Sequence, residues 1–291
     1  LDTNLLLSKT NSTTIMKTNK LILAASIVST TLLFACAEAP KKEVEEVEVV
    51  EEVEEIEEER AELMLPSPIQ IASMFNRSGL TYNAELPNSA SSVSNYNTKT
   101  KKYLNFGVYS ADMAYAVLNN KQQEAIDYLA AIKTLADETG MEAIFGSGDL
   151  INRFEKNIGE RDSVLRILTE IKIKTDSYLQ ENKEQFKTAV LFAGAWIEGM
   201  YLGSKSAEGN EMVTDRVLEQ MDVANGLIEA LKNQEDTSID LTDLITQLED
   251  LNNFFITNTT EDEEGYSVLT SENMKTLSKK ITAIRTMIVS L

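Results

Sequence analysis

The 291-residue chain contains no histidine and a single cysteine, Cys36. Histidine is the usual general base near neutral pH and the commonest zinc ligand, so its absence excludes Ser-His and Cys-His catalytic arrangements. With one cysteine the chain forms no internal disulfide, and it needs no redox chemistry in an oxidising compartment. We therefore expect a protein that is not an enzyme and that holds no cofactor and no metal.

Basic residues are also scarce. Lys and Arg number 27 against 47 Asp and Glu, and residues 61–291 alone carry 21 basic and 34 acidic side chains. An acidic surface repels phosphate backbones, so nucleic acid is not an expected partner. The stretch "IFGSGD" contains Gly146 and Gly148 but lacks the spacing and the Lys of a phosphate-binding loop, so we interpret it as a break between helices.

The sequence "MKTNKLILAASIVSTTLLFAC" begins at Met16 with two lysines and continues as an uncharged, largely apolar run to Phe34. The run is shorter than the roughly 20 residues of a membrane-spanning helix, and its layout is typical of a signal peptide. Residues 1–15 are polar and begin without methionine. We interpret them as a mis-called start, with the signal peptide at 16–35.

The end of this run, Leu33, Phe34, Ala35 and Cys36, resembles the lipobox of bacterial lipoproteins. The resemblance implies that the thiol of Cys36 receives a diacylglycerol, that the signal is cut just before it, and that the mature chain is anchored to a membrane. An ordinary secretory signal with a chance cysteine is the alternative.

A Glu-rich stretch follows the cysteine. The sequence "KKEVEEVEVVEEVEEIEEER", residues 41–60, holds 11 Glu and three basic residues, and its aliphatic residues build no lasting helical face. We therefore expect residues 36–64 to form a disordered spacer, with a transient charged helix as the alternative. Acidic residues soon after a lipidated cysteine also resemble surface-export signals of Bacteroidota-type bacteria, although here they begin only at Glu43. The resemblance implies an outer-membrane lipoprotein, on the periplasmic side or at the cell surface.

Residues 65–291 carry apolar residues at helical spacing almost throughout. Ser67 and Pro68 suit the start of a helix that Gly79 would end, and Asn120 with Gln123 resembles a capping pair. Apolar stripes follow at 104–118, 125–135, 164–171, 218–231, 241–255 and 277–288. We predict an all-α domain of eight or nine amphipathic helices packed as successive antiparallel hairpins.

Two apolar segments 86 residues apart resemble each other. "FGVYSADMAY" at 106–115 and "FAGAWIEGMY" at 192–201 share a Phe, an acid six residues later and a Tyr three beyond that. The domain could therefore consist of two related helical halves, and chance similarity between apolar helices is the alternative.

The acids of this echo, Asp112 and Glu198, are the most unusual ionisable residues, because Glu198 is the sole charge in "AVLFAGAWIEGMYLG". A carboxylate in such a run must be paired, hydrogen-bonded or protonated. In the structural interpretation these acids accept hydrogen bonds or ion pairs that lock helices together. The candidate partners are Tyr109, Tyr115, Tyr201, Arg153 and Arg166.

In the functional interpretation, Asp112 and Glu198 line one cavity for a cationic or glycan-like ligand, with Trp196, Tyr115 and Tyr201 beside them. The acidic loop at 257–267 lacks the spacing of a known calcium site, and we expect a solvated turn.

Two function hypotheses result: an interaction or scaffold protein with a partner in the cell envelope, and a small-ligand binding protein. A closed core with both acids paired favours the first, whereas a cavity of roughly a few hundred Å³ reaching Glu198 favours the second. The lipobox and the domain style resemble helical lipoproteins of Bacteroidota-type envelopes, a resemblance that implies no activity.

Overall fold

A computed structural model of the chain describes residues 65–146 and 148–290. The interpretations of residues 1–15, the signal peptide at 16–35, Cys36 and the spacer to residue 64 lie outside these described residues.

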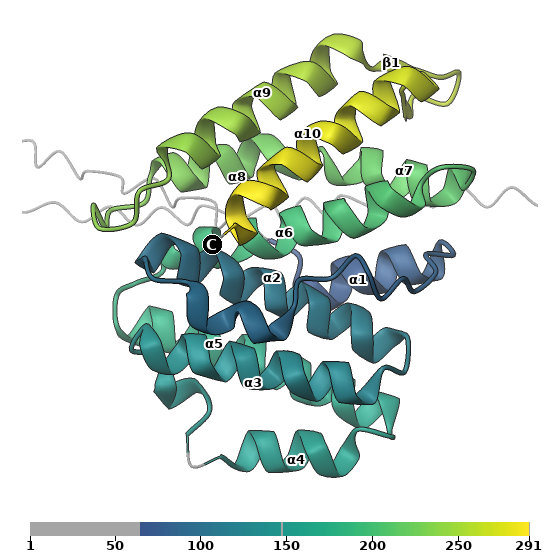
Figure 1. The fold of residues 1–291 in the computed structure, drawn as a ribbon. Coiled ribbons are helices and arrows are strands. Elements are labelled where there is room, and N and C mark those ends of the chain that lie inside the picture. The colour runs from purple at the N-terminus through teal and green to yellow at the C-terminus, as the bar shows by residue number, and fades with distance from the viewer. Residues whose placement is uncertain (1–64, 147, 291) are drawn as a thin grey trace, which may run out of the picture. The chain divides into compact units, whose positions relative to one another are not determined.

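The described part of the chain is almost entirely helical, which confirms the all-α prediction (Figure 1). Its α-helices are α1 (Pro68–Arg77), α2 (Lys99–Leu118), α3 (Gln122–Glu138), α4 (Asp149–Asn157), α5 (Arg161–Glu181), α6 (Phe186–Ser206), α7 (Glu211–Gln220), α8 (Val223–Lys232), α9 (Thr242–Asn258) and α10 (Ser271–Val289). Two short 3₁₀ helices lie at Ala90–Asn95 and Glu142–Ile144. The strands β1 (Thr260–Glu261) and β2 (Ser267–Val268) pair as an antiparallel hairpin between α9 and α10.

Ten α-helices in the described residues exceed the eight or nine that we predicted. One cause is that the stripe at 218–231 is not one helix, because at Met221 and Asp222 the backbone keeps helical angles but forms i→i+3 hydrogen bonds that separate α7 from α8. The other is α4, which follows directly after Gly148, a glycine in the left-handed conformation with φ of 84°. A short helix beside a glycine-rich break has too few apolar positions to show a clear period.

The predicted ends of α1 are confirmed. The Ser67 side chain caps the helix reciprocally with Gln70, Pro68 occupies its first turn, and Gly79 follows its end. The predicted capping pair of Asn120 and Gln123 is wrong. Lys121 is the N-cap of α3 without a side-chain cap, and Gln123 instead donates to Asp127 at 2.9 Å.

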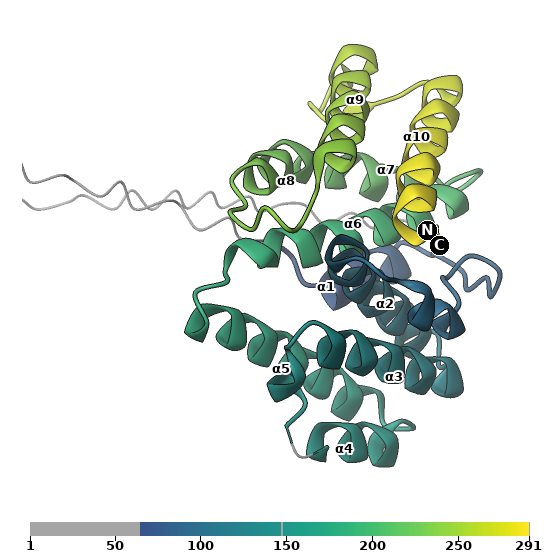
Figure 2. The same cartoon turned by 60° about the vertical axis from the view of Figure 1, so that its left-hand side comes forward.

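The centre of the domain is the pair α2 and α6, which are not consecutive in the chain and therefore not a hairpin. Figure 2 shows α3, α4 and α5 on one side of this pair and α7 to α10 on the other. The two helices touch at Gly107 and Gly194, where a Cβ on either would overlap a backbone carbonyl of the other helix. Only glycine therefore permits this approach of the two backbones.

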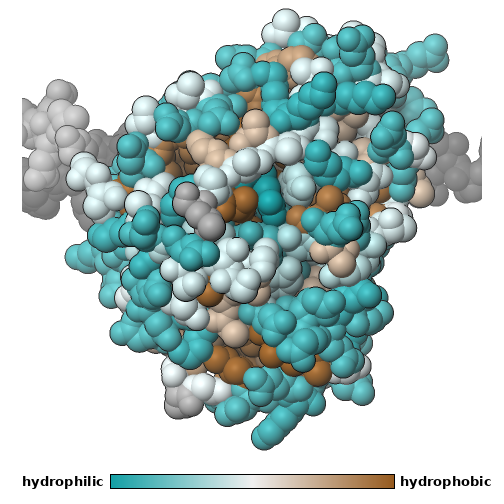
Figure 3. All heavy atoms as spheres, viewed as in Figure 1, coloured by the Kyte–Doolittle hydropathy of each residue, from teal (hydrophilic) through white to brown (hydrophobic). Residues whose placement is uncertain are grey.

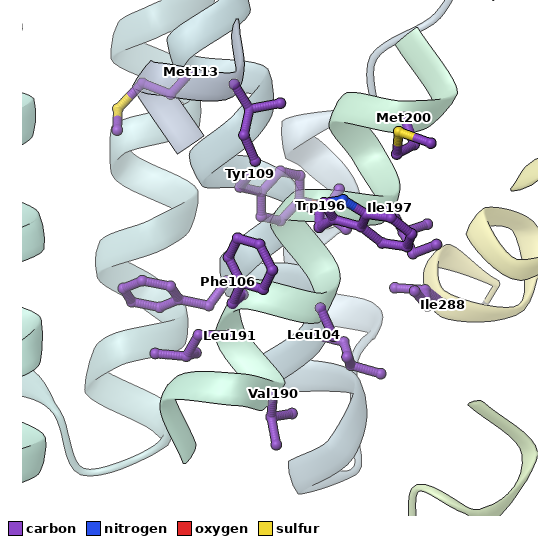
Figure 4. Close-up of a cluster of buried hydrophobic side chains, with 14 of the residues drawn as sticks. Leu104, Phe106, Tyr109, Met113, Val190, Leu191, Trp196, Ile197, Met200 and Ile288 are labelled. Atoms are coloured by element: carbon purple, nitrogen blue, oxygen red, sulfur yellow. The ribbon is translucent and has the colours of Figure 1, made fainter. Parts of the chain in front are cut away.

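The hydrophobic core surrounds this contact. Trp196, Tyr109 and Ile197 are fully buried, and Figure 4 shows them together with side chains of α2, α6 and α10. The outer surface in Figure 3 is mostly hydrophilic, with small apolar patches. Within the described residues, no helix is both long and apolar enough to cross a membrane.

Candidate functional site

Three ionisable side chains from α2, α6 and α10 meet in the core; we call Asp112, Glu198 and Arg285 the acid–arginine cluster. Arg285 donates from Nε to Oε2 of Glu198 at 2.9 Å and from Nη2 to Oε1 at 3.2 Å. Asp112 accepts a hydrogen bond at Oδ2 from the backbone N–H of Asn88 at 3.0 Å. Its Oδ1 has no hydrogen-bond partner among the described residues, and the Glu198 carboxyl lies close enough to influence its pKa. Both acids are fully buried, with 0% of their surface exposed.

The glycine contact explains why the two acids meet. Leu104 of α2 lies against Gly194 of α6, and further along both helices Asp112 meets Glu198. The contacts advance in the same direction on the two helices, so the acids lie about one helical turn beyond the crossing point. The sequence echo therefore places equivalent residues opposite each other at the centre of the fold.

The loop between α1 and α2 closes the cluster. The carbonyl of Leu86 accepts from Arg285 Nη2 at 3.3 Å, and the side chain of Asn88 donates to Tyr96 Oη at 2.8 Å. Tyr109 donates to the carbonyl of Ser89 at 2.9 Å, which fixes the same loop on α2. Backbone groups of the loop thus take the place that water would occupy around the charges.

The tyrosines have other partners than we predicted. Tyr115 donates to the carbonyl of Thr81 at 2.9 Å and accepts from the backbone N–H of Asn83 at 2.7 Å. Tyr201 presents its ring to the guanidinium of Arg285, whose Cζ lies 4.8 Å from the ring centroid. This cation–π contact covers the face of Arg285 that Glu198 leaves open.

Trp196 is fully buried in the core, and its indole Nε1 has no hydrogen-bond partner among the described residues.

The prediction that the acids pair with Arg153 or Arg166 is wrong. Arg153 binds Glu170 at 2.8 Å, and Arg166 donates to Ser163 at 3.0 Å. Arg153 lies on α4 and Arg166 on α5, and both helices are on the other side of the central helix pair from α10.

Burial and charge determine the protonation of the cluster. Burial raises the pKa of Asp112 well above its usual value, and the charge of Glu198 adds to this effect. Burial also raises the pKa of Glu198, against the opposing effects of Arg285 and of the neighbouring Asp112 carboxyl. Because Arg285 binds both oxygens of Glu198, we assign the proton to Asp112 and the negative charge to Glu198.

Arg285 remains charged. Burial lowers its pKa, but the charge and the hydrogen bonds of Glu198 outweigh this effect and raise the pKa above its usual value. The cluster thus contains one cation, one anion and one neutral acid, and it is electrically balanced. Such an arrangement can hold three helices in register, and it leaves no unpaired charge for a ligand.

Sequence reasoning missed Arg285. The residue lies directly beside the stripe Ile281, Ile284 and Ile288, on the buried side of α10. A lone Arg next to an apolar stripe predicts an ion pair between helices, because a partly buried cation there needs an anion from another helix.

Three pockets among the described residues stop short of the two acids, although Ala111 and Gly199, which adjoin the acids in the chain, line the smallest one. A cavity of about 110 Å³ separates α5 from the α2–α6 pair, and a small pocket of about 10 Å³ lies between α1, α2 and α6. A third, a groove of about 1240 Å³, runs between α7, the hairpin and α10. Neither Asp112 nor Glu198 lines any of these three.

Among the described residues no group of three or more acidic or cysteine side chains is placed to hold a metal ion.

No family model, curated protein or solved structure matches this chain.

Proposed function

We propose that this chain is a lipid-anchored protein of the bacterial outer membrane, whose helical domain binds another protein of the cell envelope. The observation that carries the proposal is the groove of about 1240 Å³ between α7, the hairpin and α10, which we call the α7–α10 groove. Pockets for small molecules are usually of roughly 300–1,000 Å³. The α7–α10 groove is larger and open, so it suits a polypeptide segment better than a small molecule.

The walls of the α7–α10 groove combine apolar and charged side chains. Met212 of α7 is 61% exposed and Val268 of β2 is 41% exposed, and both line the groove. Glu208 and Lys275 form an exposed ion pair of 3.7 Å between the α6–α7 turn and α10. Protein interfaces combine exposed apolar side chains with charged ones in this way.

The anchor and the spacer fit this function. Cys36 in its lipobox would attach the chain to the membrane, and the Glu-rich residues up to 64 would hold the domain away from an anionic surface. The acid–arginine cluster supports an interaction domain over a ligand-binding one, because its charges are balanced within the core.

Site-specific photo-crosslinking in intact cells tests the proposal. A photoreactive phenylalanine analogue in place of Met212 should form a discrete adduct with one envelope protein. The same analogue in place of Ile173, which is 58% exposed on α5 on the other side of the central helices, is the matched control and should not form this adduct.

A second substitution links the adduct to the groove. Val268→Glu places a charge in the same groove as Met212 and should abolish the adduct while leaving the melting temperature unchanged, because Val268 is exposed. If the Met212 and Ile173 positions give the same adducts, or neither gives any, the proposed interface is wrong.

A further inference from the structure

The α7–α10 groove is built mainly from the faces of two helices. On α7 the lining residues are Glu211, Met212, Thr214, Asp215 and Leu218, and on α10 they are Ser271, Met274, Lys275, Ser278 and Lys279. Both sets have the three- and four-residue spacing of one helical face. Each set extends over two turns of its helix, which is roughly 11–12 Å. A third helix of two to three turns matches this length, since helices pack by laying side chains between those of a neighbour.

Methionine supplies much of the apolar surface of the groove. Met212 of α7 is 61% exposed, and Met274 of α10 is half-buried. Val268 lies on the hairpin, which Figure 1 shows at the start of α10. Methionine side chains are unbranched and polarisable, so they adapt to the surface of a partner, and they are common in grooves that bind amphipathic helices. The groove can therefore accept the apolar face of such a helix.

The α7 side of the groove is acidic. Glu211 and Asp215 are both exposed and lie one turn apart on α7. The ion pair that lies in the groove, between Lys275 and Glu208 at 3.7 Å, uses neither of them, and neither has an ion-pair partner among the described residues. Two unpaired carboxylates one turn apart attract a row of basic side chains on the nearest edge of a partner.

The side of the groove where α6 meets α10 is basic. Ser204 of α6 and Ser278 of α10 are hydrogen-bonded at 3.2 Å, and the next residue of each helix is a lysine that lines the groove. Lys205 lies 5.5 Å from the ring centroid of Tyr201. Within the part of the chain that the structure describes, neither Lys205 nor Lys279 forms an ion pair. These two cations are available to acidic side chains of a partner.

The separation of charge between the two sides restricts what the groove can bind. A segment with charges of one sign gains on one side and is repelled on the other, which disfavours the Glu-rich residues 41–60 of this chain. We infer that the α7–α10 groove binds an amphipathic helix of the partner protein. This helix carries basic residues along the edge next to α7 and acidic residues along the edge next to Lys205 and Lys279. The inference rests on the proposed function and names the kind of segment that the partner contributes.

Three synthetic peptides of about 18 residues, long enough to form a helix, test the inference. All three share one leucine stripe at helical spacing. The mixed peptide has Lys along one edge of the stripe and Glu along the other, the Glu peptide has Glu along both edges, and the Lys peptide has Lys along both. The full chain carries Cys36→Ser and the photoreactive phenylalanine analogue in place of Met212, so that the adduct yield reports binding in the groove. The mixed peptide should give half the maximal yield at a concentration roughly tenfold lower than either other peptide.

Reversal of the charges on one side of the groove should switch this preference. Glu211→Lys with Asp215→Lys makes both sides basic, so this double variant should prefer the Glu peptide to the mixed peptide. Lys205→Glu with Lys279→Glu makes both sides acidic, so this one should prefer the Lys peptide. Because each variant binds one peptide better as it binds another less well, a folding defect cannot produce the result.

Glu155→Lys with Glu160→Lys is the matched control. Both acids are exposed and lie outside the groove, at α4 and before α5, on the other side of the central helices. This variant changes the net charge as much as Glu211→Lys with Asp215→Lys does, and it should keep the preference for the mixed peptide. The differences between the peptides should become smaller at high salt, which screens exposed charges.

The inference is overturned if the parent does not prefer the mixed peptide, or if the two charge-reversed variants keep the parent's preference. It is also overturned if a peptide of residues 41–60 forms the adduct as well as the mixed peptide does, since the chain's own Glu-rich segment would then be the occupant. The proposed function fails by a different result, the absence of a Met212 adduct with an envelope protein in cells. Such an adduct without the peptide preference overturns this inference alone.

Discussion

Arg285 of α10 binds both carboxylate oxygens of Glu198 on α6, at 2.9 and 3.2 Å. The Glu198 side chain is fully buried and that of Arg285 is 14% exposed, so the pair joins the last helix of the chain to the centre of the core. Asp112 completes the arrangement as a neutral acid, and the following predictions test it.

Glu198→Ala should lower the free energy of unfolding by about 2–4 kcal/mol, because it leaves Arg285 without its anion in a buried site. Glu198→Gln should cost less, since the amide keeps the packing and Asp112 can then ionise beside Arg285. Urea denaturation of the two variants measures the difference.

A double variant separates charge from packing. Glu198→Leu with Arg285→Leu removes both charges and should be more stable than Glu198→Ala, because no charge remains buried alone. If both Glu198 variants unfold at the same urea concentration as the parent, the pair does not stabilise the fold.

Asp112→Asn should remove a pH-dependent loss of stability. The pKa of Asp112 is raised in the folded state, while in the unfolded chain it is about 3.9. Between these two values the folded protein binds more protons than the unfolded chain, so the free energy of unfolding falls as the pH rises. Asparagine can still accept the hydrogen bond from Asn88, but it does not ionise.

The measurement is the free energy of unfolding from pH 4 to pH 9, for the parent and for Asp112→Asn. We expect the variant to gain stability relative to the parent as the pH rises through this range. The raised pKa of Glu198 acts in the same direction in both proteins, so only the difference between the curves is informative. Parallel curves would show that Asp112 is not protonated in the folded state.

Gly194→Ala should destabilise the domain by about 2 kcal/mol or more, because the new Cβ overlaps the backbone of Leu104 and forces α2 and α6 apart. This cost exceeds the gain of about 1 kcal/mol in helix propensity from Gly to Ala. Gly159→Ala is the control, since Gly159 is exposed and a Cβ there meets only the end of the flexible Gln122 side chain. Thermal unfolding of both variants should show a lower melting temperature for Gly194→Ala alone.

Cys36→Ser should release the protein from the membrane fraction, because the substitution removes the thiol that a lipoprotein modifies. Fractionation of cells that express the parent or the variant, followed by immunoblotting, tests this. A Lys41→Ser variant, altered in the spacer instead, should remain with membranes. Membrane association of Cys36→Ser equal to that of the parent would rule out the lipid anchor.

Much of the helical architecture was predictable from local features. The apolar stripes of α2, α3, α5, α9 and α10 have the 3.6-residue period, and Ser67, Pro68 and Gly79 mark the ends of α1. These signals depend on neighbours within a few residues, so the sequence carries them directly. The break at Met221 and Asp222 was not predictable in this way, since the apolar period continues across it.

The candidate site, too, was predictable from the sequence only in part. The isolation of Glu198 in an apolar run predicts a buried acid with a partner, and the chain by itself determines this much. Which partner it has is a tertiary result. Arg285 lies 87 residues away, and it reaches Glu198 only because α10 packs on α6. The cavity of about 110 Å³ between α5 and the α2–α6 pair is likewise a tertiary result, because it depends on distances between helices that no local pattern encodes.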